Sequence, residues 1–265
     1  MRAAAARRIG RGLIAIVRRT ARRWAHRPST MDKVFLSPHF DDVALSCGGM
    51  VAMAAAAGER VLVVTVCAAL PPPARRSPWT DRIHAARGFA DGIAYVSARR
   101  EEDRASAVVL GTQVEWGHSL DAIYRDPTHY NCSRTLLGPP ASGDPLVAET
   151  AALIGDLKRR FPHAELYAPL GTGHIDHRGV SQAARMASGQ MCLYQEFPYR
   201  GPPSAGVSPD AAELVAVPPA FFSTWVRAVL CYRSQLRGLF GDESAARAAV
   251  ISHAESTRGT RIWRI

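Results

Sequence analysis

The chain has 265 residues, of which 47% are hydrophobic and 21% are charged, and its formal net charge is +10. This length and apolar fraction suffice for a substantial core and exclude a disordered chain, a fibrous repeat and a small disulfide-rich domain. No two of the five cysteines are close enough for a Cys-x-x-Cys zinc or redox pair, so we expect a reduced, cytoplasmic protein.

The positive charge is concentrated at the N-terminus. Residues 1–30 hold nine arginines and no acidic residue, so the rest of the chain is nearly neutral and nucleic-acid binding is not expected. We interpret residues 1–30 as a basic extension, either solvated or in peripheral contact with an anionic membrane surface. Residues 31–265 are expected to form one domain. No apolar run reaches the roughly 20 residues of a membrane span, so no integral membrane segment is expected.

Strand and helix patterns alternate from Val34 onward. The run 61–66 is apolar on both faces, which is typical of a central strand in a parallel sheet that helices cover on both sides. Residues 126–145 are rich in Asp, Pro, Gly and Ser and are expected to form a long irregular loop. The fold class is therefore α/β, a Rossmann-like open, mostly parallel sheet with helices on both faces. The other expected strands are 34–36, 114–116, 164–170, 191–197 and 261–265, and the expected helices are 45–57, 98–110, 146–161, 180–187 and 221–239.

Two polar clusters follow expected strands, at residues 37–42 (SPHFDD) and 171–177 (GTGHIDH). In open α/β sheets, ligands bind beyond the carboxyl ends of the strands. Two imidazoles and one carboxylate, with a fourth position open for water, are a usual catalytic zinc set. Asp41 would then lie beside that water as a base. The alternative is that His39 and Asp42 only cap the following helix.

The two clusters resemble the His-Pro-Asp-Asp and His-Pro-Asp-His boxes of the PIG-L (LmbE-like) family of zinc-dependent N-acetylglucosamine deacetylases. Phe40 and Ile175 replace the prolines of these boxes, and Val43 stands where many members have Glu. None of the three is a ligand. The resemblance extends over residues 31–265, because the segments 99–103, 110–111, 121–125 and 232–235 are similar to recurrent segments of the bacterial natural-product branch.

The resemblance implies a metal site and a general base. It implies one zinc ion per chain, with His39, Asp42 and His177 as its ligands. Asp41 would be the general base that accepts the proton of the attacking water.

The resemblance also implies groups around the substrate. His174, oriented by Asp176, would stabilise the oxyanion. Arg99 and Asp121 would line the sugar site. Independently of the resemblance, Trp79 lies in a proline-rich loop and is expected to be an exposed aromatic that stacks on a sugar ring.

The expected function is that of a metal-dependent N-deacetylase. It would hydrolyse the N-acetyl amide of an N-acetylglucosaminyl-containing small molecule or glycosylated natural product, and it would release acetate and the free amino sugar. The branch of the family that the chain resembles places this reaction in antibiotic biosynthesis.

Two other interpretations remain open. His39, Asp41 and His177 also match the two-histidine, one-carboxylate site of non-haem iron oxygenases, although that site normally occurs in a β-rich barrel. The second interpretation is a non-catalytic module that binds a sugar or a nucleotide. Gly48-Gly49 lacks the full Gly-x-Gly-x-x-Gly pattern, which weakens the case for a dinucleotide.

Overall fold

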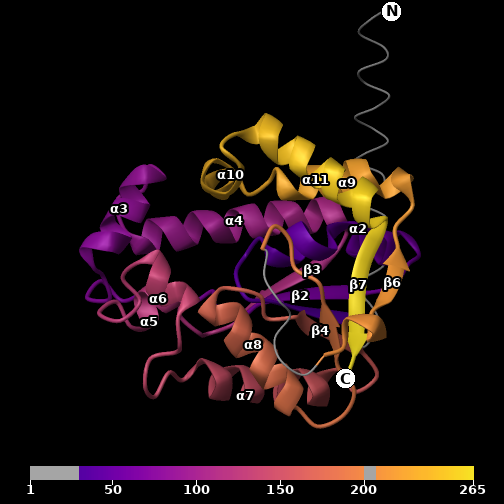
Figure 1. The fold of residues 1–265 in the computed structure, drawn as a ribbon, viewed down its shortest axis with the longest axis horizontal. Coiled ribbons are helices and arrows are strands. Elements are labelled where there is room, and N and C mark those ends of the chain that lie inside the picture. Colours follow the sequence, from indigo (N-terminus) through magenta and orange to yellow (C-terminus); the bar gives the residue numbers. More distant parts are fainter. Residues whose placement is uncertain (1–29, 200–206) are drawn as a thin grey trace, which may run out of the picture. The chain divides into compact units, whose positions relative to one another are not determined.

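A seven-stranded sheet runs through the computed structural model, which describes residues 30–199 and 207–265 (Figure 1). The basic extension expected at residues 1–30 lies outside the described residues, except for Thr30. None of the helices in the described ranges is long and apolar enough to span a membrane. The sheet order is β3-β2-β1-β4-β5-β7-β6. The strands are β1 (Lys33–Ser37), β2 (Val61–Thr65), β3 (Gln113–Trp116), β4 (Glu165–Pro169), β5 (Cys192–Tyr194), β6 (Glu213–Ala216) and β7 (Gly259–Arg264).

The strand order reverses between β1 and β4. From β1 the chain continues to β2 and then β3 on one side, whereas β4 and β5 lie on the other side, and all five strands are parallel. Only the edge formed by β7 and β6 is antiparallel. A reversal of this kind leaves a crevice beyond the carboxyl ends of the two central strands, and such crevices are the usual ligand sites of open α/β sheets.

Helices cover both faces of the sheet, as the sequence predicts (Figure 1). In Figure 1, α4, α9, α10 and α11 lie above the sheet and α7 and α8 lie below it. The longer helices are α2 (Asp42–Ala56), α3 (Pro78–Ala86), α4 (Gly92–Leu110), α7 (Leu146–Arg160), α8 (Ile175–Met186), α9 (Phe222–Val229), α10 (Arg233–Phe240) and α11 (Glu243–Thr257). The short helices are α5 (Ala122–Arg125), α6 (Ser133–Leu137) and two 3-10 turns, η1 (Pro209–Ala211) and η2 (Pro219–Phe221).

Two large apolar clusters fill the space between these helices and the sheet. Phe35 packs into the cluster with α2, α4, α9 and α11, whereas its neighbours Val34 and Leu36 pack into the cluster with α7 and α8. Successive side chains of a strand point to opposite faces, so the three central residues of β1 are all apolar because both of its faces are covered. The fold class predicted from the sequence is confirmed.

Several details of the fold differ from the sequence prediction. Helix α4 begins at Gly92 rather than at residue 98, and strand β5 ends at Tyr194 rather than at residue 197. The helix expected at 221–239 is two helices, α9 and α10, because the chain turns at Tyr232, whose buried phenol donates to Asp103 at 2.8 Å. Helix α8 begins at Ile175 rather than at residue 180, which places His177 in its first turn. Helices α3 and α11 and strand β6 were not expected. The loop at 126–145 contains the short helix α6.

Helix α2 packs closely on the indole of Trp225, which is fully buried and donates to the carbonyl of Ala44 at 2.8 Å. A Cβ added to Gly48 would collide with this indole. We expect Gly48→Ala to lower the free energy of unfolding by about 1–3 kcal/mol, the usual effect of overpacking a core. Gly155→Ala in α7 is the control, because its Cβ would meet only the Arg159 side chain at 3.6 Å and should be neutral or stabilising. Urea unfolding of both variants measures the difference, and equal stabilities would contradict the prediction.

Candidate metal centre and active site

The two polar clusters of the sequence meet in the crevice between β1 and β4. His39 and Asp41 lie in the turn between β1 and α2, and Asp42 is the first residue of α2. His174 is the N-cap of α8, and His177 lies in its first turn. The turn after β1 is fixed by Ser37, whose hydroxyl donates to the carbonyl of His39 at 2.5 Å and accepts from an amide of α2. Local hydrogen bonding thus fixes the first cluster, and the pairing of β1 with β4 places the second cluster beside it.

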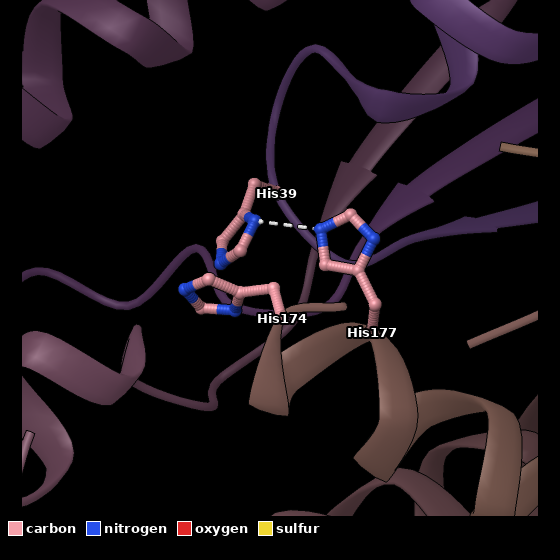
Figure 2. Close-up of side chains that lie close together, drawn as sticks. All are labelled: His39, His174 and His177. Carbon is pink, nitrogen blue, oxygen red and sulfur yellow. Dashed lines mark hydrogen bonds between the residues drawn. The ribbon is translucent and has the colours of Figure 1, made fainter. Parts of the chain in front are cut away.

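Three possible metal-ligand atoms converge there. His177 Nε2 lies 3.3 Å from His39 Nδ1, and Asp42 Oδ2 lies 3.4 Å from His39 Nδ1 and 3.2 Å from His177 Nε2. Figure 2 shows His39 and His177 facing each other through these nitrogens, with His174 beside them. All three side chains of the set are buried. The structure therefore brings together the residues that the sequence predicts as zinc ligands.

The tautomers of both histidines follow from their other partners. His39 Nε2 lies 3.0 Å from Asp176 Oδ2, and His177 Nδ1 lies 2.5 Å from Glu196 Oε1. An ionised carboxylate only accepts hydrogen bonds, so each of these ring nitrogens carries the proton. The opposite nitrogens, His39 Nδ1 and His177 Nε2, then keep their lone pairs for a metal when the rings are neutral. Carboxylates behind histidine ligands are a recurrent feature of metal sites.

The donor set fits a zinc ion. Zinc bonds of about 2.0–2.1 Å in a tetrahedron separate the ligand atoms by about 3.3–3.4 Å, which matches the spacing of the three atoms described above. Asp42 Oδ1 is buried without a hydrogen-bond partner among the described residues. Burial alone would raise the pKa of Asp42, but the adjacent His177 and His39 outweigh it and hold that pKa at about 2. Asp42 is therefore a carboxylate, as a metal ligand must be.

The side chain of Asp41 pairs with Arg99 rather than with the two imidazoles. Its Oδ1 accepts a hydrogen bond from Arg99 Nη2 at 2.8 Å, and both side chains are buried. Burial raises the pKa of Asp41, and the charge of Arg99 opposes that rise. Asp41 is the N-cap residue of α2, but its side chain makes no capping hydrogen bond. The carboxylate is thus held beside the metal centre without being one of the three converging ligands.

His174 lies beside the other two imidazoles and is held by the backbone of α8. Its Nδ1 accepts the amide N–H of Asp176 at 3.2 Å, so Nε2 is the nitrogen that carries the proton of the neutral ring. Burial lowers the pKa of His174 to about 3, and Asp176 opposes this change. His174 can therefore offer one N–H donor to a group bound at the metal centre.

The expected orientation of His174 by the carboxylate of Asp176 differs from what the structure shows. Asp176 Oδ2 is 3.9 Å from His174 Nδ1, whereas it accepts hydrogen bonds from His39 Nε2 and from the amide of Ala122, each at 3.0 Å. The reason is helical geometry, because an N-cap side chain faces the amide of the second residue after it rather than that residue's side chain. Asp176 supports His39 through its carboxylate and His174 only through its amide.

The remaining predicted site residues lie in different surroundings. Asp121 follows β3, and its Oδ2 lies 3.7 Å from His39 Nε2. Its contact with a sugar, like that of Arg99, stays a prediction. Trp79 is half-buried in α3 and packs against the larger apolar cluster, so its ring is not the exposed platform that the sequence suggested. Stacking of Trp79 on a sugar also stays a prediction.

Glu196, just after β5, is a site residue that sequence reasoning missed. It is buried, and its second oxygen accepts the amides of Gly171 and Thr172 at 2.7 and 2.6 Å. One carboxylate thus fixes both the ring of His177 and the glycine-rich turn that leads to α8. An isolated Glu after an apolar run carries no motif, and only its position at a third strand end could have drawn attention to it.

We expect Glu196→Gln to weaken metal binding by about 10- to 100-fold, the usual effect of removing a carboxylate behind a ligating histidine. The amide of Gln can keep a hydrogen bond to His177, but it lacks the negative charge that makes the imidazole a stronger metal ligand. Competition with a chromophoric chelator measures the affinity. Glu149→Gln is the control, because Glu149 accepts only from the Ser119 hydroxyl on its side-chain Oε2 and touches no ligand. Unchanged affinity in Glu196→Gln would contradict the prediction.

Comparison with known proteins gives consistent results. The sequence model of the PIG-L family, described as GlcNAc-PI de-N-acetylase, matches residues 34–188. The 2'-N-acetylparomamine deacetylase of Niallia circulans is 29% identical over 259 residues, which cover 88% of this chain and 93% of the relative.

Solved structures of deacetylases are also similar. The zinc-inhibited form of teicoplanin deacetylase is 29% identical, with a TM-score of 0.74 and coverage of 88% of this chain and 97% of that chain. The deacetylase of the A40926 pseudoaglycone is 26% identical, with a TM-score of 0.71 and coverage of 89% and 98%. The family match, which spans both polar clusters, confirms the resemblance drawn from the sequence. The chain belongs to the PIG-L family and is a hydrolytic N-deacetylase.

Proposed function

We propose that the enzyme removes the N-acetyl group from an N-acetylglucosaminyl unit of a glycosylated natural product and releases acetate and the free amine. The observation that carries the proposal is the convergence of His39 Nδ1, Asp42 Oδ2 and His177 Nε2 in the crevice of the sheet. The substrate class is supported by relatives that are named for teicoplanin, an A40926 pseudoaglycone and 2'-N-acetylparomamine. These names support antibiotic biosynthesis as the setting.

We propose zinc as the metal, one ion per chain, with those three residues as its ligands. A zinc ion held there would supply a water of lowered pKa and a Lewis acid for the amide carbonyl. The arrangement also discriminates against the iron oxygenase alternative. That alternative requires Asp41 as the carboxylate ligand, but Asp41 is paired with Arg99, and Asp42 is the carboxylate that faces both imidazoles.

Asp41 carries the proton transfers, and His174 stabilises the charge that develops on the substrate. Arg99 holds Asp41 Oδ1, which leaves the second oxygen of Asp41 to accept the proton of the attacking water. Asp41 then returns this proton to the nitrogen of the departing amine. His174 donates its Nε2–H to the negative charge that develops on the carbonyl oxygen. Its fixed ring needs no reorientation during the reaction.

We expect His174→Ala to lower kcat by about 10² to 10³ with little change in KM, because its hydrogen bond strengthens only as charge develops on the oxygen. The metal content should stay at the wild-type level, since His174 is not one of the three ligands. Steady-state kinetics together with metal analysis of the same preparation measures both quantities. A large rise in KM with unchanged kcat would instead assign His174 to ground-state binding.

We propose that the enzyme works in the cytoplasm, because all five of its cysteines are free thiols. Its proposed partner is a small-molecule amino-sugar substrate. Peripheral contact of residues 1–30 with an anionic surface stays a prediction, and vesicle sedimentation at low and high salt would test it.

The activity is tested by incubating the zinc-loaded enzyme with a panel of N-acetylglucosaminyl compounds, including free N-acetylglucosamine, an N-acetylated aminoglycoside and a glycopeptide. Release of acetate and of a primary amine in equal amounts is the expected result. Binding without release from any compound would favour the sugar-binding module. Oxygen consumption by the iron-loaded protein would favour the oxygenase.

A further inference from the structure

Arg125, the last residue of α5, is a buried cation between two carboxylates. Its Nη2 donates to Asp176 Oδ1 at 2.6 Å and to Asp144 Oδ2 at 2.9 Å, and its Nε donates to Asp144 Oδ1 at 2.8 Å. Its Nη1 donates to the carbonyl of Leu120 at 2.7 Å. The side chain of Arg125 is 5% exposed, and that of Asp176 is fully buried. Every charge in this network is therefore paired inside the protein.

Asp176 connects this cation to the metal centre. One carboxylate oxygen, Oδ1, is bound by Arg125, and the other, Oδ2, accepts the proton of His39 Nε2. The direction of Oδ2 sets the direction of the imidazole, and so the position of the ligand atom Nδ1 on its far side. Arg125 has no contact with the converging ligand atoms, and its influence on them passes through Asp176.

The guanidinium of Arg125 also holds the long loop at residues 126–145 in place. Asp144, at the C-terminal end of this loop, also accepts the phenol of Tyr130 at 2.5 Å and the amide of Leu146, which starts α7. Tyr130 and Ala141 pack with Ile175 in a small separate apolar cluster. Ile175 lies between His174 and Asp176 in the sequence, so the docked loop covers the backbone that carries both site residues.

We infer that Arg125 is a positioning residue for the metal ligand His39 and that it acts through Asp176. This inference rests on the proposed function only in taking His39 as a ligand. Burying a guanidinium, two carboxylates and a phenol is unfavourable unless each is paired, so the network holds one arrangement. When Arg125 loses its side chain, Asp176 keeps a charge without its partner and can turn away from His39.

The test measures zinc affinity by competition with a chromophoric chelator in four variants: Arg125→Met, Arg125→Lys, Asp176→Asn and the double variant Arg125→Met/Asp176→Asn. We expect Arg125→Met to weaken zinc binding by about 10- to 100-fold, as removal of a group that orients a ligand does. Arg125→Lys should recover part of this loss, because the ammonium keeps a charge near Asp176 but not the forked geometry. The double variant should bind zinc no more weakly than Asp176→Asn alone, since Arg125 acts through Asp176.

Arg178→Met is the matched control for loosening the loop. Arg178, on α8, donates to the carbonyl of Gly138 in the same loop but has no hydrogen bond to Asp176 among the described residues. Its zinc affinity should stay within about twofold of wild type, even if the melting temperature falls as it does for Arg125→Met.

Three results would overturn the inference. They are unchanged affinity in a folded Arg125→Met, equal weakening in Arg178→Met, and losses from Arg125→Met and Asp176→Asn that multiply in the double variant. If Arg125→Met does not fold, the Arg125→Lys variant decides the matter: weaker zinc binding than wild type supports the inference, and wild-type affinity in that variant, with Asp176→Asn weakened, overturns it. Absence of zinc binding by the wild-type protein would instead refute the proposed function.

Discussion

Replacing His177 by alanine is expected to leave the enzyme without its metal and without measurable turnover. Two protein ligands hold zinc poorly, and Glu196, which loses its imidazole partner, stays held by the amides of Gly171 and Thr172. Metal analysis after dialysis and the release of amine from the substrate measure the two losses. His163→Ala, an exposed histidine between α7 and β4, should change neither quantity.

A second variant separates loss of metal from loss of fold. His177→Ala leaves the buried Glu196 without its imidazole partner, so its melting temperature should fall as well. Asp42→Asn keeps the size of the side chain and removes only the charge, and it should also lose the metal. Full metal occupancy in either variant would refute the ligand assignment.

The Asp41→Asn variant should keep its zinc and lose about 10² to 10⁴ in kcat. An amide cannot accept the proton of water, and the loss of a general base typically has an effect of this size. Asp41 does not belong to the three converging ligands, so zinc affinity should change far less than in Asp42→Asn. Zinc content and kcat measured on the same preparation give the comparison, and Asp156→Asn, an exposed carboxylate of α7, is the control.

The contrast between the two neighbouring aspartates decides between reaction classes. Loss of metal in Asp41→Asn, with metal retained in Asp42→Asn, would identify Asp41 as the ligand and favour the iron oxygenase. Arg99 loses its buried charged partner in Asp41→Asn, so a loss of stability is expected alongside the kinetic effect. Because it follows from the broken Arg99–Asp41 ion pair, this stability change should be present with and without zinc.

The central sheet could be predicted from the sequence because its strands carry their own signal. β2 is buried throughout and apolar at its first four positions, and a short run of this kind directly after the turn at Gly58 favours a buried strand. β6 could not be predicted in this way. Its four residues are mostly exposed and it pairs only with β7, so its strand conformation depends on an antiparallel partner far along the chain. The break between α9 and α10 likewise depends on the buried contact of Tyr232 with Asp103.

The convergence of His39, Asp42 and His177 could be predicted because these residues lie in two short segments that the order of the strands brings together. The groups that hydrogen-bond to these side chains and hold them in place could not be predicted. Glu196 and Arg125 come from elements whose distance from these side chains in space is set by the whole sheet. Glu196 belongs to no recognisable motif, and Arg125 ends the segment 121–125, whose similarity to the family implies no role for it. The partner of the Asp176 carboxylate could not be predicted, for a related reason. Adjacency in sequence suggested His174 as its partner, whereas the fold gives its carboxylate to His39.

The pairing of β5 with β7 has a genetic consequence. The carbonyl of Arg261 in β7 accepts the amide of Gln195, the residue directly before Glu196. A nonsense mutation at about codon 258 would leave every ligand codon intact, yet the truncated product would lack β7. It would expose β5 as an unpaired edge that invites self-association. Such alleles should behave as full loss-of-function alleles, and a scan of stop codons along the gene should find no tolerated position before β7 is complete.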